Sequence, residues 1–212
     1  MIVKSQNPSL VDSGPIVIKC PGCGQGGTFT KFQNLQDLHL PNSAKGFLFL
    51  GHRQCPNPSC QAHVFFVRAQ NGDLLTYPSL RVDFDSNNIP QTIKNALEEA
   101  ISCHANGCFM AAGIMVRRTL EELCSERGVS GGNLKQRLNS LQDKVILPPE
   151  LFEAMDELRI LGNDAAHIES KEYDQIGNNE IEVAIELTKE ILKAIYQMNS
   201  LVNKLKSLKK QQ

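Results

Sequence analysis

The chain has 212 residues, enough for one large domain or two smaller ones. Its 22 basic and 23 acidic residues almost cancel and 41% of its residues are hydrophobic, which excludes a disordered chain and a uniformly basic surface for nucleic acid. No apolar run approaches the roughly eighteen residues of a membrane span, and the N-terminus lacks the apolar core of a signal peptide. These features predict a cytoplasmic globular protein that makes no membrane contact.

Two cysteine pairs stand in the first third of the chain, as Cys20-Pro-Gly-Cys23 and Cys55-Pro-Asn-Pro-Ser-Cys60, with 31 residues between them. Each pair lies in a turn rich in Gly or Pro, which lets both thiolates face one point. Four thiolates suit a tetrahedral zinc ion, and such a closed site has no open position for catalysis. We therefore expect structural Zn²⁺ on the four ligands Cys20, Cys23, Cys55 and Cys60.

Short β-prone segments flank these pairs. Residues 15–19 precede the first pair, residues 63–68 follow the second, and Asn71-Gly72-Asp73 predicts a hairpin turn. Together they predict a small β-rich zinc ribbon over residues 1–77. Since four thiolates already suffice for the metal, His52 and His63 are expected to be solvated or hydrogen-bonded loop residues.

The composition changes after Tyr77-Pro78, so residues 78–89 are interpreted as a linker and residues 90–212 as an all-α bundle of four or five helices. Apolar positions spaced by three and four predict helices at about residues 90–106, 108–127, 134–143, 148–168 and 179–208. The second is apolar on most faces and is expected to be central. Its Cys124, like Cys103 and Cys108 nearby, is interpreted as a small buried side chain. The fold class is therefore α+β.

The last predicted helix would extend about 45 Å, more than a compact bundle of this size needs to cover. An end that protrudes would expose its apolar stripe. This favours a homodimer formed through the helical bundle by an antiparallel or parallel coil, with packing inside one chain as the alternative.

Two polar clusters interrupt the helical pattern. In the second helix, Arg117-Arg118 and Glu121-Glu122 have the spacing of ordinary ion pairs four residues apart. Arg117 nevertheless shares a side with apolar residues and needs a partner. In the fourth helix, the polar residues are Arg159, Asn163, Asp164 and His167. We expect one polar pocket if the two clusters meet, formed by Arg117, Arg118, Glu121 and Asp164 together with the residues around them.

The order of these motifs closely resembles the bacterial family named domain of unknown function 4145. The resemblance rests on CPGCG, YP, EAISCHANG, AAGIMVRRTLEELC and LRILGNDAAH, and covers nearly the whole chain. It implies a HEPN-like helical bundle behind the zinc ribbon, in a setting of restriction or other anti-phage systems. Many HEPN proteins are dimeric, metal-independent ribonucleases with an Arg and a nearby His, whereas others are interaction modules.

Carried onto this chain, the resemblance makes Arg159 and His167 catalytic candidates, with Asn163 between them. A histidine could move the proton of an RNA 2′-hydroxyl, and an arginine could hold the phosphorane. The gap of seven residues is longer than in the family motif, so the two Cα atoms would lie about 12 Å apart on a continuous helix. A symmetric dimer could bring the two groups together between chains.

A structural interpretation of the same residues competes with the catalytic one. In it the helix ends at Gly162, and Asn163 or Asp164 caps the following turn. Arg159 then pairs with Asp156 or Glu157, and His167 has only a structural role.

Three functions are compatible with the sequence. The first is a zinc-containing interaction or nucleic-acid-associated module in phage defence or restriction, with RNA, DNA or a protein as partner. The second is a ribonuclease centred on Arg159 and His167. The third is a nucleotide- or phosphate-binding bundle that uses Arg117, Arg118 and Asn163. The first is preferred, because the gap between Arg159 and His167 is irregular and the net charge is close to zero.

Overall fold

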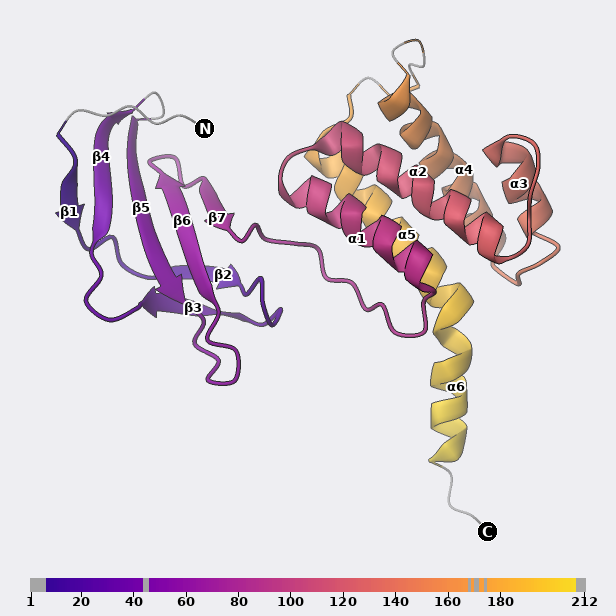
Figure 1. Ribbon diagram of the computed structural model, residues 1–212, viewed down its shortest axis with the longest axis horizontal. Coiled ribbons are helices and arrows are strands. Elements are labelled where there is room, and N and C mark those ends of the chain that lie inside the picture. Colours follow the sequence, from indigo (N-terminus) through magenta and orange to yellow (C-terminus); the bar gives the residue numbers. More distant parts are fainter. Residues whose placement is uncertain (1–6, 44–45, 168, 170–171, 174, 209–212) are drawn as a thin grey trace. The chain divides into compact units, whose positions relative to one another are not determined.

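The computed structural model describes residues 7–43, 46–167, 169, 172–173 and 175–208. The chain forms two compact units, Met1–Arg81 and Val82–Gln212. The first is built from β-strands and the second from helices (Figure 1), which confirms the predicted α+β class. Among the helices in the described part of the chain, none has both the length and the apolar character needed to cross a membrane.

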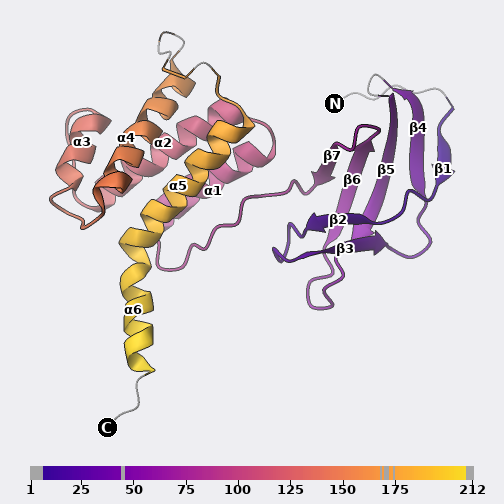
Figure 2. The same ribbon diagram turned by 180° about the vertical axis from the view of Figure 1, so that it is seen from behind.

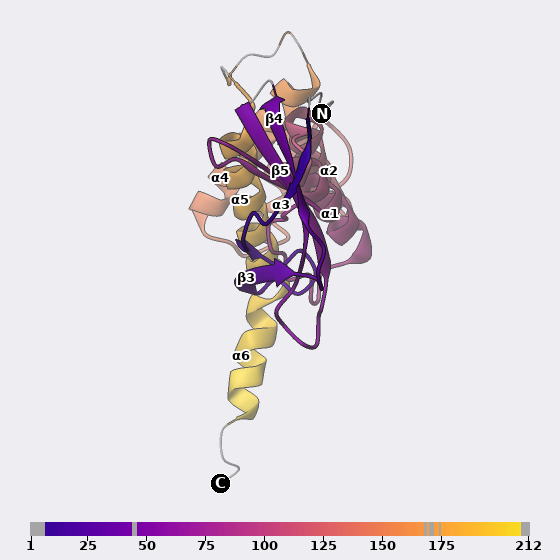
Figure 3. The ribbon, with the colours of Figure 1, turned by 90° about the vertical axis from the view of Figure 1, so that its left-hand side faces the viewer.

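The β unit is antiparallel throughout the described pairs. Its strands are β1 Ser9–Val11, β2 Ile16–Lys19, β3 Gly26–Lys31, β4 Asp37–Ser43, β5 Gly46–Gln54, β6 His63–Ala69 and β7 Leu74–Tyr77. The strands β1, β4, β5, β6 and β7 lie in that order, while the end of β5 also pairs with β3, and β3 with β2. The β2–β3 hairpin consequently runs across the end of the long strands (Figures 1 and 3).

The two predicted β segments are confirmed as β2 and β6, and the predicted turn joins β6 to β7, with Gly72 at φ 91°. The sheet is larger than the expected ribbon, because β3, β4 and β5 fill the interval between the cysteine pairs. The sequence of β5, GFLFLGHRQ, mixes apolar and polar residues without clear alternation. Both of its faces carry apolar side chains, so a period of two does not stand out.

One face of the sheet holds the core of the β unit. Phe29, Val64 and Phe66 are buried there with Ile16 and Ile18 of the β2–β3 hairpin. This core also encloses an ion pair. The side chains of Arg53 and Asp37 are 0% and 1% exposed, and two hydrogen bonds of 2.8 and 2.7 Å join them. A carboxylate and a guanidinium paired in this way are stable when buried only while both are present.

The helical unit contains six helices in its described residues. They are α1 Gln91–Ala105, α2 Phe109–Glu126, α3 Leu134–Leu141, α4 Pro149–Ala166, α5 Asn178–Tyr196 and α6 Met198–Ser207. α2 packs against α1, α3, α4 and α5, which confirms its predicted central place. Its buried Val116, Leu120 and Leu123 meet Met155 of α4 and Ile185 of α5 in one core. In Figure 2, α5 lies in front of α1, with which it is in contact.

Local signals fix most helix ends. Pro90 precedes α1, and Gly107 ends it at φ 73°, with its N–H bonded to the His104 carbonyl at 2.9 Å. Asn133 and Gln136 form a capping box at the start of α3. Of the three cysteines expected to be buried, Cys124 is buried and Cys103 is partly buried, but Cys108 is exposed, because it lies in the turn before α2.

The prediction of a single last helix is wrong, because α5 and α6 are separate helices on either side of Gln197. The amide of this buried residue donates to the Asp85 carbonyl at 2.8 Å and to the Asn87 carbonyl at 3.0 Å. Gln197 thus anchors the junction to the segment before α1. A single sequence gives no sign of this long-range contact.

The prediction that α4 could end at Gly162 is also wrong, because the helix continues to Ala166. Gly162 instead allows α2 and α4 to approach closely. A Cβ atom at Gly162 would lie 2.5 Å from Cβ of Arg117 and 3.0 Å from the Gly113 carbonyl oxygen. The glycine is therefore required by helix packing rather than by a helix end.

Gly162→Ala is expected to destabilise the helical unit by about 1 to 3 kcal/mol, because the added methyl group forces α2 and α4 apart. At an open helical position the same change would stabilise by about 0.5 to 1 kcal/mol, so the sign is diagnostic. Chemical denaturation followed by circular dichroism measures the effect. Glu153→Ala, on the exposed side of α4, is the matched control, and equal stability of the two variants would refute the packing role.

Candidate functional site

The four predicted metal ligands come together in the β unit. Cys20 and Cys23 lie in the turn between β2 and β3, whereas Cys55 follows β5 and Cys60 precedes β6. Backbone hydrogen bonds close both turns, including Gly24 N–H to the Cys20 carbonyl at 2.9 Å and Cys60 N–H to the Asn57 carbonyl at 3.0 Å. The four sulfur atoms all lie within 4.8 Å of one another.

The spacing of the thiols fits a tetrahedral metal ion. Sγ of Cys20 lies 3.8 Å from Sγ of Cys60, and Sγ of Cys23 lies 3.9 Å from Sγ of Cys55. A zinc–sulfur bond of about 2.3 Å gives a tetrahedron with sulfur–sulfur edges of about 3.8 Å. These four cysteines could therefore hold a metal, and the all-thiolate donor set suits zinc.

The residues around the four thiols pack closely against them. A Cβ atom at Gly22 would lie 3.1 Å from Ala62 Cβ and 3.3 Å from Cys60 Sγ. A hydrogen bond from the Gln25 backbone lowers the pKa of the Cys23 thiol to about 7, whereas burial raises the pKa of Cys55 to about 12. The thiol of Cys23 is thus exposed and easily ionised, whereas the thiol of Cys55 is buried.

Beside the cysteine turns, four side chains form a cluster of rings, which we name the ring cluster: Phe32, His52, His63 and Phe65. The His52 and His63 rings stack with centroids 4.9 Å apart, and His52 Nε2 lies 2.8 Å from His63 Nδ1. Phe32 meets both imidazoles edge-on, and Phe65 lies 4.9 Å from His52. The two histidines are hydrogen-bonded, as expected, but they stand in strands β5 and β6 rather than in loops. Burial, followed by the charges of His63 and Arg53, lowers the pKa of His52.

The ring cluster belongs to the face of the sheet opposite the core, which we name the open face. Directly opposed residues of antiparallel strands share a face. One row on it therefore runs His52, Phe65, Tyr77, and another runs Leu10, Leu38, Leu50, Val67, Leu75. Phe65 is 57% exposed and Tyr77 is 74% exposed. Among the strand residues described in these rows, none is charged, so the open face is apolar and aromatic. Leu38, Leu50 and Val67 pack against a small buried cluster on this face, formed by Leu40, Leu48 and Ala69, so its exposed aromatic part lies around Phe65 and Tyr77.

The polar residues of the helical unit have partners close by. Nε of Arg159 lies 2.6 Å from the Asp156 carboxylate, as the structural interpretation expects. Arg117 lies 3.3 Å from Glu121 and also donates to the Arg159 carbonyl at 3.4 Å. The structure therefore brings Arg117 and Arg159 together, one from α2 and one from α4.

The remaining predicted residues point to different neighbours. Arg118 is more than half exposed and pairs with Glu122 at 2.5 Å. Asp164 is buried, and its carboxylate accepts hydrogen bonds from the backbone N–H groups of Glu172 and Tyr173 at 2.7 and 2.8 Å. His167 is exposed at the end of α4, where its backbone N–H donates to the Asn163 carbonyl at 2.9 Å.

Comparison with known proteins bears on the helical unit. A family model described as Domain of unknown function (DUF4145) matches residues 98–211, more than half of the chain. The chain belongs to the DUF4145 family. No curated protein and no solved structure matched it. The matched residues begin within α1, so the cysteine turns and the ring cluster lie outside the DUF4145 region.

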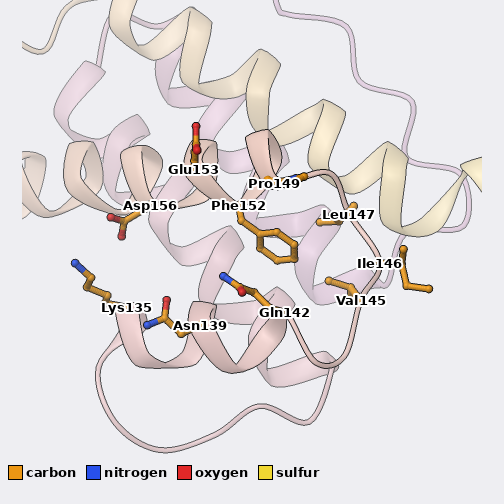
Figure 4. A pocket seen from close by; sticks show the side chains of 10 residues that line it. All are labelled: Lys135, Asn139, Gln142, Val145, Ile146, Leu147, Pro149, Phe152, Glu153 and Asp156. Atoms are coloured by element: carbon orange, nitrogen blue, oxygen red, sulfur yellow. The ribbon is translucent and has the colours of Figure 1, made fainter.

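A cavity of about 680 Å³ opens in the DUF4145 region between α3, α4 and the segment that joins them. Figure 4 shows Phe152 at its centre, with Gln142 and Asn139 on the α3 side and the ends of Lys135 and Asp156 toward one another. The residues predicted as a polar pocket in the two helices do not line it. The segment after α3 lines part of the cavity, and its sequence carries no recognisable binding motif.

Sequence reasoning found the thiols but missed the ring cluster as a unit. The sequence shows His52 and His63 only as neighbours of Cys55 and Cys60, and nothing in it indicates that the two imidazoles meet. Their meeting depends on the register of β5 and β6, which pairs His52 with Phe65 and Gln54 with His63. That register is set by the pairing of β5 with β6 and is not visible in any local motif.

Proposed function

We propose that the chain is a zinc-stabilised binding module whose β unit binds single-stranded nucleic acid on its open face. The observation that carries this proposal is the ring cluster, in which four rings touch at the sheet surface, with His63 and Phe65 exposed and Phe32 and His52 half-buried. Proteins that bind single strands commonly stack bases on aromatic side chains of a sheet, because every base has a flat face. Stacking of this kind contributes about 1 to 3 kcal/mol per base.

The polar groups around the rings suit unpaired bases. Since Nδ1 of His63 is bonded to Nε2 of His52, its Nε2 is the ring nitrogen that can donate or accept a hydrogen bond at a base edge, and the amide of Gln54, which stands opposite His63, can do the same. Phe65 and the neighbouring Tyr77 offer the larger exposed surfaces. A single strand can place successive bases on such a row, whereas paired bases inside a duplex leave no face to stack.

The charge of the β unit favours a polyanion. Residues 1–81 contain seven Lys or Arg and three Asp, and no Glu. Asp12 pairs with Lys31 at 2.6 Å, and Asp37 is buried against Arg53. Even with the charge of about −2 of a zinc tetrathiolate, the unit stays positive. The modest excess predicts binding that depends mainly on stacking, with a shallow dependence on salt.

The metal centre would support the same surface. Cys55 stands three residues after His52, and Cys60 stands three residues before His63. A zinc ion on these thiolates would tie together the strand ends that carry the two histidines. When bound, it supplies structural cross-linking rather than a reactive site, since four thiolates leave no open position. The defence setting implied by the sequence resemblance makes phage RNA and DNA suitable first probes.

Phe65→Ala is expected to raise the Kd for single-stranded RNA or DNA about tenfold, because one stacking surface is lost. Fluorescence anisotropy with labelled oligonucleotides and the zinc-loaded full chain measures the change. Val17→Ala, which truncates another exposed apolar side chain of the β unit, is the matched control and should bind like the unaltered chain.

Two results would contradict the proposal. One is equal loss of affinity in both variants, and the other is no measurable binding of either nucleic acid. The length of the RNA after incubation is followed in parallel. Cleavage that His167→Ala abolishes would support the ribonuclease instead, so the assay also decides between binding and the catalytic hypothesis for Arg159, Asn163 and His167.

A further inference from the structure

The last helix of the DUF4145 region lacks a buried face. None of the ten residues of α6, all of them described, is buried. Its apolar residues are nevertheless arranged as a stripe at Met198, Leu201, Val202 and Leu205, and Leu205 is 70% exposed. In Figures 1 and 2, α6 continues beyond the rest of the bundle. An amphipathic helix with an uncovered apolar stripe is typical of a helix that pairs with another molecule.

This stripe continues along the outer side of α5. Helical hydrogen bonds run through the junction, from Gln197 N–H to the Lys193 carbonyl at 2.9 Å and from Leu201 N–H to the Gln197 carbonyl at 3.0 Å. At 100° per residue, one arc of about 60° therefore holds six apolar positions, and Val202 lies about 40° beyond its edge. The six are Val183, Leu187, Ala194, Met198, Leu201 and Leu205.

At the α5 end, the stripe forms one wall of an apolar groove. The groove has a volume of about 310 Å³ and lies between α4 and α5. Leu158 and Leu161 of α4 face Val183 and Leu187 of α5 across it, and acidic residues stand at its rim, among them Glu180. An apolar surface on α6 and an apolar groove along α5 are thus present in the same chain.

The charges along the two helices differ. The first half of α5 carries Glu180, Glu182 and Glu186 and no basic residue, whereas α6 carries Lys204 and Lys206 and no acidic residue. If two copies paired in parallel, lysine would face lysine and glutamate would face glutamate. If they paired antiparallel, the basic α6 of each copy would lie along the acidic half of the other copy's α5. Charge complementarity therefore selects the antiparallel arrangement.

We propose that two copies of this chain form a symmetric dimer through antiparallel pairing of their α5–α6 segments, with the two-fold axis beside Ala194. This register places Leu201 against the partner's Leu187 and Leu205 against the partner's Val183, so that each α6 fills the groove of the other copy. Lys204 then lies near the partner's Glu186. The small side chain at the axis lets the two helices approach closely. The pairing does not depend on nucleic-acid binding.

Leu205→Glu tests the interface, because the side chain is exposed in one copy and the change leaves the core intact. The full chain is expected to sediment as a dimer at micromolar concentration, and Leu205→Glu to raise the dimer Kd about tenfold or more. Asn203→Glu adds the same charge on the opposite side of α6 and should leave the dimer unchanged. A monomeric unaltered chain, or equal effects of the two variants, would overturn the proposal.

The antiparallel direction of the helix pairing is tested by cross-linking in a Cys108→Ser background, which removes an exposed thiol. Under mild oxidation Ala194→Cys should link two chains, because residues at a two-fold axis meet their own copies, and Leu205→Cys should not. In a parallel pair each interface residue would meet its own copy, so a cross-link at Leu205→Cys, whether or not Ala194→Cys also links, would indicate parallel pairing and overturn the arrangement.

Charge reversal gives a second test of direction. Lys204→Glu and Glu186→Lys should each raise the dimer Kd about two- to fivefold, and the double variant should restore it. Additive loss in the double variant would contradict the proposed pairing of these two residues.

Discussion

Replacement of Cys23 by serine is expected to abolish zinc binding and to unfold the β unit, while the helical unit keeps its structure. A structural zinc contributes about 10 to 16 kcal/mol of apparent binding free energy in small peptides. A whole domain is stable by only about 5 to 15 kcal/mol. Loss of the metal therefore removes most or all of the stability of a unit whose small core adjoins the thiolates. Cys23 is exposed, so the change itself creates no cavity.

Elemental analysis should find about one zinc ion per unaltered chain and none in Cys23→Ser. Circular dichroism and proteolysis then report which unit has unfolded, since the helices have a separate core. Cys108→Ser is the matched control, because that thiol is also exposed but lies outside the four-cysteine group. Full zinc content in Cys23→Ser, or a stable β unit without metal, would refute a structural tetrathiolate site.

The meeting of the four cysteines could be predicted because short motifs determine the geometry of each pair. Two residues between Cys20 and Cys23 and four between Cys55 and Cys60 form tight turns, and tight turns are local. The helices were predictable for a similar reason, since one period repeats along each segment. Cys20, Cys23, Cys55 and Cys60 met as expected, although the strands that hold them apart were only partly foreseen.

What the sequence could not show depends on contacts between distant residues. The last helical segment divides into two helices at Gln197, whose amide reaches the carbonyls of Asp85 and Asn87, although helical hydrogen bonds continue on both sides of the junction. Asp164 was predicted to line a polar pocket, because an acidic side chain on a helix is usually in contact with solvent. Its carboxylate instead accepts hydrogen bonds from the backbone N–H groups of Glu172 and Tyr173. The ring cluster arises from strand register. In each case the local pattern was correct, and the partner was invisible in the sequence.

The buried ion pair of the β unit leads to a second large effect. Asp37→Ala is expected to destabilise this unit by about 3 to 5 kcal/mol, because it leaves the Arg53 guanidinium buried without its counter-charge. Denaturant unfolding of the zinc-loaded chain, followed by tyrosine fluorescence, measures the loss. The double variant Asp37→Leu, Arg53→Met should recover most of it, since an apolar pair of similar volume removes both buried charges. A single variant as stable as the unaltered chain would show that the pair is not required.

The same pair predicts how stability depends on pH. Burial raises the pKa of Asp37, but hydrogen bonds from Arg53 and Ser13 outweigh it, so the pKa lies below the ordinary value of an aspartate. A carboxyl whose folded pKa is lowered stabilises the fold fully above its unfolded pKa and loses that contribution as the pH falls through the folded pKa. The contribution of Asp37 should therefore be complete above about pH 4 and decline below it. The double variant lacks this carboxyl, so its stability should fall less steeply in acid than that of the unaltered chain. Parallel acid-unfolding curves would contradict a role for the ion pair, because then other groups would account for the whole pH dependence.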